Sequence, residues 1–246
     1  MKMFARAAAL ACAVALVPTL AVPASAQEKT AKKEGFTLRN GSVRIILMRP
    51  SVRVGAQSTG GMFEPNADWT AQARENIAHA LAAAQESLGN KIVPYEEPPV
   101  AEAPVVAQYD HLFRAVADSV IEYQFFKGNR LPTKKRSDGF QWSIGPGITR
   151  LKALRGADYA LFINTYDAYG STGRKVLQVV GALGGVAIKS GEHVGHAGLI
   201  DLKTGELVWL NADRQMGGDV RTPEGAQKRV RELLKGFPGR SPQAEQ

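Results

Sequence analysis

The sequence predicts an α/β fold in which one mixed β-sheet carries helices packed against it. Its first half alternates strand-like with helix-like segments, which is typical of parallel strand pairing. Two apolar runs near the end of the chain, joined by a tight turn, predict an antiparallel hairpin. No internal repeat or shift in composition marks a boundary, so we expect a single domain over residues 42–236.

Three segments of the first half predict strands. Ser42–Met48 is a β-branched run that ends before Pro50, Lys91–Tyr95 is short, and Ala157–Tyr166 is a long buried run. The stretch Gly55–Pro65 is rich in Gly, Ser and Thr, and we expect a loop there.

The clearest predicted helix covers Asn66–Leu88. Asn66 or Asp68 can cap its start, and Gly89 supplies a left-handed residue at its end. Its apolar residues recur at helical spacing on one face, which should face the sheet: Trp69, Ala73, Ile77, Ala80, Leu81, Ala84 and Leu88.

Three further helices are expected. Val105–Phe126 is long and amphipathic, whereas Ile148–Leu154 is a short helix. The last helix starts at Thr222, which is followed by a proline suited to the first helical position, and it stops at Gly236.

The predicted hairpin joins strands Val194–Leu202 and Leu207–Asn211. Gly205 occupies the left-handed position of the turn. Asp201 is expected to shape the same turn through its side chain.

The first 26 residues resemble a cleavable secretory signal. Lys2 and Arg6 precede the apolar run Ala7–Leu20, and a small-residue site follows, so we expect cleavage after Ala26 and a periplasmic or secreted protein. We further expect a flexible leader over residues 27–41 and a disordered tail over residues 237–246.

The single cysteine, Cys12, lies inside the signal segment. Too few apolar residues precede it for a lipoprotein signal, so lipidation is not favoured. The chain after cleavage would then contain no disulfide and no thiolate nucleophile.

Positive charge narrows the choice of partner. The net charge of +8 falls to +6 when Lys2 and Arg6 leave with the signal (8 − 2 = 6). A basic protein can bind nucleic acid, but export argues against that partner. We therefore expect an envelope protein or an anionic envelope polymer as partner, and self-association into a homo-oligomer is an open alternative.

No set of residues predicts catalysis, a metal or a cofactor. His193 and His196 are three residues apart on a predicted strand, so they should point to opposite faces and not share an ion. Phosphate-loop and nucleophile-elbow patterns are absent. Acidic residues that folding could bring together are Glu64, Asp68, Asp158, Asp167 and Asp201.

Two segments are candidate interaction surfaces. The first is a basic loop whose aromatic residues either meet an anionic partner or are buried in the core; it contains Lys134, Lys135, Arg136, Phe140 and Trp142. The second, Val176–Ile188, is apolar and could serve self-association or membrane contact, or lie buried under the sheet; its key residues are Val180, Gly181, Gly184 and Gly185. Its 13 residues are too few to span a bilayer, so we expect no transmembrane span.

The hairpin also carries a resemblance. The segment from Asp201 through Thr204 and Gly205 to Trp209 resembles the Asp-Leu-x-Thr-Gly-x-x-x-Trp hairpin of periplasmic domains of the CsgG, LpoB and TolB amino-terminal type. The resemblance extends over roughly residues 42–235. It implies a non-catalytic protein that assembles envelope machines or binds partners through sheet edges and loops. The absence of a clear lipidated cysteine departs from that group.

These observations favour an exported, non-enzymatic binding or assembly module of the bacterial cell envelope. One alternative is an envelope hydrolase whose carboxylates are brought together by the fold, which requires a pocket with at least two acids of perturbed pKa. Another alternative is a membrane-interacting protein that uses residues 176–188.

Overall fold

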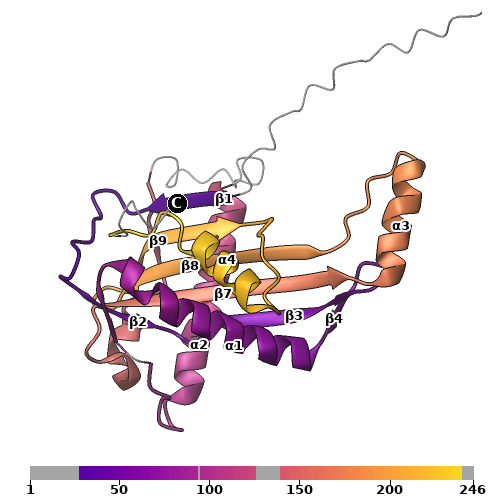
Figure 1. Ribbon diagram of the computed structural model, residues 1–246. Helices are drawn as coiled ribbons and strands as arrows, with labels where there is room; N and C mark the ends of the chain where they lie inside the picture. The colour runs from indigo at the N-terminus through magenta and orange to yellow at the C-terminus, as the bar shows by residue number, and fades with distance from the viewer. Residues whose placement is uncertain (1–27, 94, 126–138, 240–246) are drawn as a thin grey trace, which may run out of the picture.

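The computed structural model describes residues 28–93, 95–125 and 139–239, and these form one mixed sheet with four α-helices (Figure 1). The strands are β1 (Glu28–Lys32), β2 (Arg44–Leu47), β3 (Ser51–Gln57), β4 (Phe63–Pro65), β5 (Lys91–Val93), β6 (Trp142–Ser143), β7 (Tyr159–Gly170), β8 (Glu192–Asp201) and β9 (Glu206–Asp213). The helices are α1 (Ala67–Ala84), α2 (Ala103–Val120), α3 (Thr172–Leu183) and α4 (Pro223–Leu233).

The strand order confirms the predicted mixed sheet. The main path runs β1-β9-β8-β7-β2-β5, with β7 at its centre. On one side of β7, strands β2 and β3 follow one another in parallel pairing, and β5 pairs in parallel with β2. On the other side β8, β9 and β1 are antiparallel. The first half is therefore parallel at its core and the C-terminal hairpin is antiparallel.

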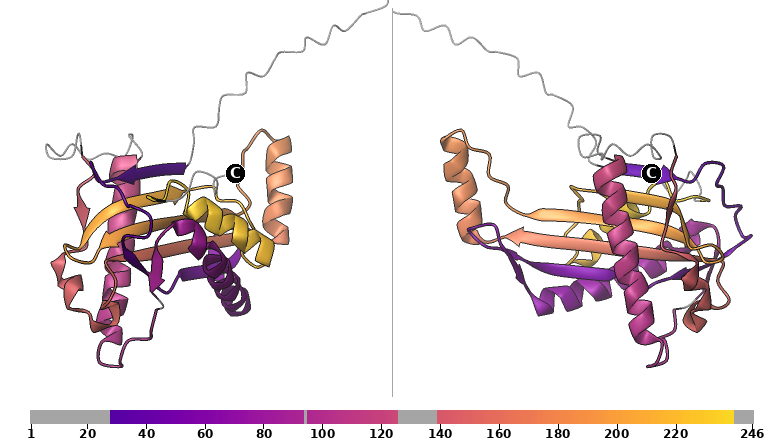
Figure 2. Two further views of the ribbon diagram at one scale, coloured as in Figure 1. Left: turned by 60° about the vertical axis from the view of Figure 1, so that its left-hand side comes forward. Right: turned by 180° about the vertical axis from the view of Figure 1, so that it is seen from behind.

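Helices cover the two faces of the sheet unequally. Helices α1 and α4 pack side by side on one face, over a core that includes Ile77, Trp209 and Leu233. Helix α2 lies across the other face, where Phe113 stacks on Phe162 at 4.7 Å between ring centroids. Figure 2 (right) shows β7 and β8 continuing past α2 toward α3.

The predicted helix starting at Asn66 is confirmed. The Asn66 side chain accepts a hydrogen bond from the backbone N–H of Trp69 at 2.9 Å, which caps α1. The α-helix ends at Ala84, a 3₁₀ turn continues to Leu88, and Gly89 has the left-handed φ of 68°. Its buried face contains Ala73, Ile77, Ala80 and Leu81.

The other predicted helices differ mainly at their ends. Helix α2 begins two residues earlier than expected and continues into a π-helical turn over Ile121–Phe125. The predicted short helix over 148–154 consists of two 3₁₀ turns, Pro146–Arg150 and Lys152–Leu154. Helix α4 is capped by Thr222, whose hydroxyl accepts the backbone N–H of Gly225 at 3.1 Å.

The predicted hairpin is β8–β9. Asp201 Oδ1 accepts backbone N–H groups of Lys203 at 2.7 Å and Thr204 at 3.3 Å, as expected for a residue that shapes the turn. Gly205 has φ 75°, the left-handed conformation that the pattern predicts.

The predicted loop Gly55–Pro65 is shorter than expected, since only residues 58–62 form a turn and both ends of the range belong to strands. Residues 51–57 form β3, which runs parallel to the end of β7, and Phe63–Pro65 forms β4 antiparallel to it. Pro50 interrupts pairing because it lacks a backbone N–H, but the chain resumes along the same edge of β7. Val52 and Val54 are buried, so the alternation typical of a strand was present there.

Both ends of the described chain belong to the fold, which corrects two expectations. The leader predicted over 27–41 contains β1, paired antiparallel with β9, and Leu38 is buried in the core. At the other end Phe237, placed in the predicted tail, is buried and packs edge-on against Trp209 at 5.2 Å. Short polar segments are ordered here because they complete a sheet edge and a core already formed by other elements.

Helix α3 stands away from the sheet. It is carried at the extended ends of β7 and β8 and has no buried residue (Figures 1 and 2). The alternative that residues 176–188 lie buried under the sheet is therefore wrong. Among the described helices, none combines the length and apolarity that crossing a membrane requires.

Candidate functional site

The projecting helix α3 and its return segment, together called the α3 arm (residues 171–191), expose an apolar surface. Five of its large apolar side chains are 57–86% exposed, far more than a packed helix face allows: Val176, Val179, Val180, Leu183 and Val186. A contiguous exposed apolar patch of this kind is typical of a contact surface.

The apolar residues lie on one side of the helix. At 100° per residue, Val176, Val179, Val180 and Leu183 fall within one arc. Gln178, which is also exposed, falls on the opposite side. Helix α3 is therefore amphipathic, with its apolar face turned away from the return segment.

The glycines of the arm serve its own turn. Gly181 faces Ile188 of the return segment so closely that a Cβ would collide with the Ile188 side chain. Gly184 ends the helix, and Gly185 takes the left-handed φ of 76°. These positions allow the chain to reverse, and they do not leave a bare backbone surface for another helix.

Polar contacts hold the base of the arm. Ser171 caps α3 by accepting the backbone N–H of Arg174 at 3.3 Å. The Arg174 guanidinium donates to the carbonyl oxygens of Lys189 at 2.9 Å and Thr59 at 3.2 Å, which ties both stems of the arm together. Lys175 of α3 remains exposed beside the apolar face.

A polar groove lies on the α2 face of the sheet and reaches the base of the arm. Its volume is about 1280 Å³. The C-terminal part of α2 forms one wall, and β3, β7, β8 and β9 provide the floor. Because α2 crosses only part of this face, the extended ends of β7 and β8 are left without a covering helix (Figure 2).

Three residues that line this groove have a buried polar atom without a hydrogen-bond partner. Among the described residues, five buried side-chain nitrogen or oxygen atoms lack a hydrogen-bond partner, and three belong to groove residues: Arg114 Nε, Asn164 Oδ1 and His196 Nε2. Asn164 and His196 face each other across β7 and β8. Such unsatisfied groups are costly, which makes this groove a candidate binding site.

The electrostatics of the groove follow from burial beside arginines. Burial and the positive charge of Arg114 lower the pKa of His196 to about 4, so its imidazole is neutral at pH 7. Burial raises the pKa of Asp118, although Arg53 and Arg114 oppose this rise. The Arg53 guanidinium also lies over the Tyr166 ring at 5.1 Å.

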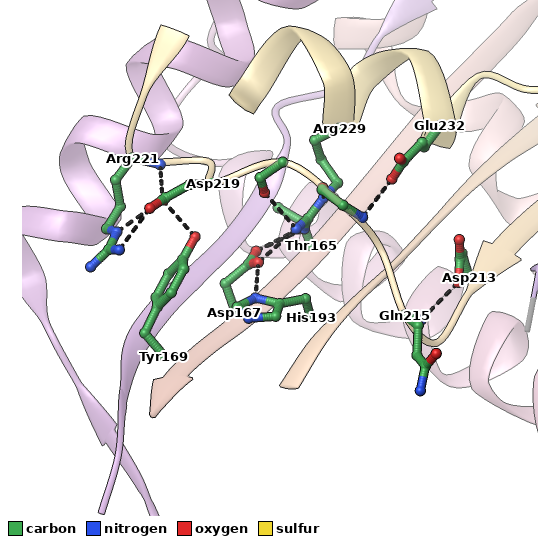
Figure 3. A network of polar contacts seen from close by, with 12 residues as sticks. Thr165, Asp167, Tyr169, His193, Asp213, Gln215, Asp219, Arg221, Arg229 and Glu232 are labelled. Atoms are coloured by element: carbon green, nitrogen blue, oxygen red, sulfur yellow. Dashed lines mark hydrogen bonds and ion pairs between the residues drawn. The ribbon is translucent and has the colours of Figure 1, made fainter. Parts of the chain in front are cut away.

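The opposite face contains a buried ionic network centred on Asp167 (Figure 3). Arg229, fully buried, donates two hydrogen bonds to Asp167 at 2.7 and 2.8 Å and others to Thr165 and the Gly217 carbonyl. His193 Nδ1 lies 2.8 Å from Asp167 Oδ1. Burial alone would raise the pKa of Asp167, but the hydrogen bonds from His193 and Arg229 lower it.

A second ionic cluster adjoins this network. Arg221 pairs with Asp219 through two side-chain hydrogen bonds and lies over the rings of Tyr169 at 3.7 Å and Trp69 at 4.6 Å. The Tyr169 hydroxyl donates to Asp219 at 2.7 Å. These contacts join α1, β7 and the segment before α4, which is a structural role.

The prediction that the two histidines point to opposite faces of the sheet is confirmed. His193 contacts Asp167 on the α4 face, whereas His196 contacts Phe113 of α2 on the other. Among the described residues, no group of three or more His, Cys, Asp or Glu side chains could hold a metal ion.

Three of the five acidic residues considered for catalysis make separate structural contacts. Asp158 accepts hydrogen bonds from the backbone N–H of Arg44 at 2.8 Å and from the Arg44 guanidinium. Burial raises the pKa of Asp158, but these hydrogen bonds outweigh burial, and the pKa is lowered. Asp201 shapes the hairpin turn and Asp167 is bound by Arg229. Glu64 lies in β4 and Asp68 in the first turn of α1.

The candidate basic loop is only partly described. Lys134, Lys135 and Arg136 lie outside the described residues. Phe140 is buried in the core beneath α2, and Trp142 is half-buried, with its indole N–H donated to Gln124 Oε1. Both aromatic side chains therefore pack inward.

Sequence reasoning missed the groove because its residues come from separate elements. Arg53 lies next to the predicted loop, and Arg114 is one polar residue among many on α2. The available signal was Asn164, one of three buried polar residues in the long strand β7.

The fold and its two surfaces define a mixed-sheet α/β domain with a projecting apolar arm and a polar groove. No family model and no curated protein matches the chain. Among solved structures, it is similar to PelC from Paraburkholderia phytofirmans, described as a dodecamer, with 14% identity and a TM-score of 0.34 over 87% of this chain and 99% of that one. A single-residue variant of that dodecamer gives 13% identity and the same TM-score and coverage. Neither likeness carries a functional assignment.

Proposed function

We propose that this protein is an exported, non-enzymatic binding module of the bacterial cell envelope, and that the α3 arm docks it onto an anionic membrane surface. The observation that carries the proposal is the amphipathic α3, whose apolar face is exposed beyond the end of the sheet. The resemblance of the β8–β9 hairpin to non-catalytic envelope proteins supports the same class.

The shape of the arm favours a membrane surface over a second copy of the chain. Gly181, Gly184 and Gly185 are used by the arm's own turn and do not offer a close helix–helix contact. A helix of 12 residues is too short to span a bilayer but can lie in its interface with the apolar side buried. Lys175 beside that side would meet anionic headgroups.

Export would bring the arm to such a surface. The expected cleavage after Ala26 would leave a chain that starts just before β1, so the signal would be removed without cutting an element of the sheet. We propose a periplasmic or secreted location on this basis.

Flotation of the protein with phosphatidylglycerol-containing vesicles tests the docking. Val180→Asp should weaken binding at least tenfold, because it replaces a buried apolar contact by a charge that anionic lipid repels. Gln178→Asp, which adds the same charge on the opposite side of α3, should bind within about threefold of the parent chain.

Three results would contradict the proposal. The first is equal binding by the Val180→Asp and Gln178→Asp variants, and the second is no binding by the parent chain. The third is a lipid-independent dimer in sedimentation equilibrium that Val180→Asp dissociates, since this would assign the apolar face to a second copy.

A further inference from the structure

We propose that the polar groove on the α2 face binds a neutral, hydroxyl-rich ligand of the saccharide class. This site is separate from the α3 apolar face, and the inference goes beyond membrane docking. It is carried by the unpartnered polar atoms, the balance of charge and the size of the groove.

The inner end of the groove is a built site. Asn164 and His196 are only 9% and 4% exposed, and they are partners in the β7–β8 register. Arg114 of α2 is close enough to His196 to influence its ionisation. One polar atom of each of these three side chains has no hydrogen-bond partner.

The chemistry of these atoms selects the ligand group. Arg114 Nε can only donate a hydrogen bond, whereas Asn164 Oδ1 can only accept one. His196 is neutral and offers one donor and one acceptor nitrogen. A hydroxyl group donates and accepts at once and satisfies both kinds of partner, while an ionised carboxylate has no proton to donate to Asn164.

Charge in the groove argues for a neutral ligand. Among the described residues, five cationic and four acidic side chains line it. Two of these side chains, the cationic Arg214 and the acidic Glu122, form an ion pair with each other at 3.3 Å. Asp118 already faces the positive charges of Arg53 and Arg114. An added anion would therefore compete with acidic groups that are built into the site.

The dimensions of the groove indicate more than one sugar ring. Its volume of about 1280 Å³ exceeds the range of about 300–1,000 Å³ typical of small-molecule sites. Its lining extends from Asn164 and His196 to Arg174 and Lys189 at the base of the arm. A short chain of sugars has the length and the hydroxyl density to follow this path.

Calorimetric titration with three neutral tetrasaccharides, chitotetraose, cellotetraose and maltotetraose, tests the site, with inorganic phosphate as the anionic comparison. We expect saturable binding of at least one tetrasaccharide and none of phosphate below 10 mM (roughly the weakest affinity of a specific small ligand). Asn164→Ala should weaken that binding at least tenfold, because it removes the acceptor for the ligand hydroxyl.

Stability measurements and control variants keep the result interpretable. Asn164→Ala should not lower Tm, since it removes an unsatisfied buried group. Gln72→Ala, at an exposed position of α1 on the opposite face, should bind as the parent chain does. Val180→Asp should also bind normally, which separates this site from membrane docking. Failure of all three tetrasaccharides to bind at ~10 mM, binding of phosphate alone, or unchanged binding by Asn164→Ala would overturn the inference.

Discussion

Single residues of the Asp167 network fix the centre of the sheet against α4. Arg229 is fully buried, and its guanidinium donates hydrogen bonds to Asp167, Thr165 and the backbone. These hydrogen bonds offset the free-energy cost of removing the ion pair from water. Removal of one partner would leave the other buried and unpaired. The network therefore has a structural role. Among the described residues, the only hydrogen-bond partner of the His193 side chain is Asp167.

Arg229→Leu should lower the free energy of unfolding by about 3–5 kcal/mol, because Asp167 would remain buried without its cation. Urea denaturation measures the change. Arg231→Leu, an exposed arginine two residues along α4, should change stability by less than about 0.5 kcal/mol. Equal effects of the two substitutions would contradict the structural role of the buried pair.

His196 should make stability fall with falling pH. Its pKa of about 4 in the folded protein lies below the ordinary 6.5 of the unfolded chain, so between these values the unfolded chain binds a proton that the folded chain does not. Stability is therefore lost as pH drops through this window, by about 3 kcal/mol at most.

Denaturation at pH 7 and at about pH 4.5, near the lower end of this window, measures the loss. His196→Gln should remove most of its share of the pH dependence, whereas His79→Gln on the exposed side of α1 should keep it. The buried state of His196 is refuted if the two variants show the same pH dependence as the parent chain.

At the residue scale, sequence could predict only local contacts. The Asn66 cap and the Asp201 turn were predicted because each acts on backbone groups within three residues. The pairing of Arg229 with Asp167 spans 62 positions and depends on how α4 packs over β7, which no spacing rule reveals.

At the scale of elements, the packing of α2 depends on the glycine beneath it. Phe113 sits on Gly198 of β8, where a Cβ would come within 2.5 Å of the ring. Phe113 is also held by its stack on Phe162. The absence of a side chain at position 198 therefore sets how closely α2 approaches the sheet.

Gly198→Ala should destabilise the protein by about 1–3 kcal/mol, because the ring is packed on both sides and cannot yield without moving α2. Thermal unfolding provides the measurement. Gly60→Ala, in an open turn without left-handed backbone, is the matched substitution and should cause no loss. An unchanged Tm in Gly198→Ala would mean that α2 does not approach β8 this closely.

Elements with strong periodicity were predictable, and those completed by partners were not. The apolar residues of α1 recur at helical spacing, and β7 contains a long apolar run, so the sequence alone predicts both elements. Strand β1 is short and polar and forms only because β9 offers an edge, while β3 was hidden by Pro50 and Gly55. Helix α3 was recognised as apolar, but its exposure depends on the length of β7 and β8.

For the whole molecule, the sheet holds the arm and the groove at the same end. The extended ends of β7 and β8 carry α3 and also form the uncovered floor of the groove (Figure 2). Fold class and hairpin topology followed from the order of elements. The groove could not be predicted, because it exists only where α2 stops covering the sheet.

The proposed export predicts which residue forms the N-terminus of the mature protein. Mass spectrometry of the protein from the periplasmic fraction of its bacterial host should find Gln27 as the first residue. Recovery of the chain with Met1 attached in the cytoplasmic fraction would contradict the proposed location.

The depth of α3 in a bilayer tests the central claim most directly. Cys12 is the one cysteine of the sequence, so the chain from Gln27 can be spin-labelled at a single introduced cysteine without side reactions. With anionic vesicles, a nitroxide in Val180→Cys should become accessible to oxygen and protected from a water-borne nickel reagent, while one in Gln178→Cys should stay exposed to water. If both labels remain equally water-exposed on vesicles, α3 does not dock this protein to a membrane.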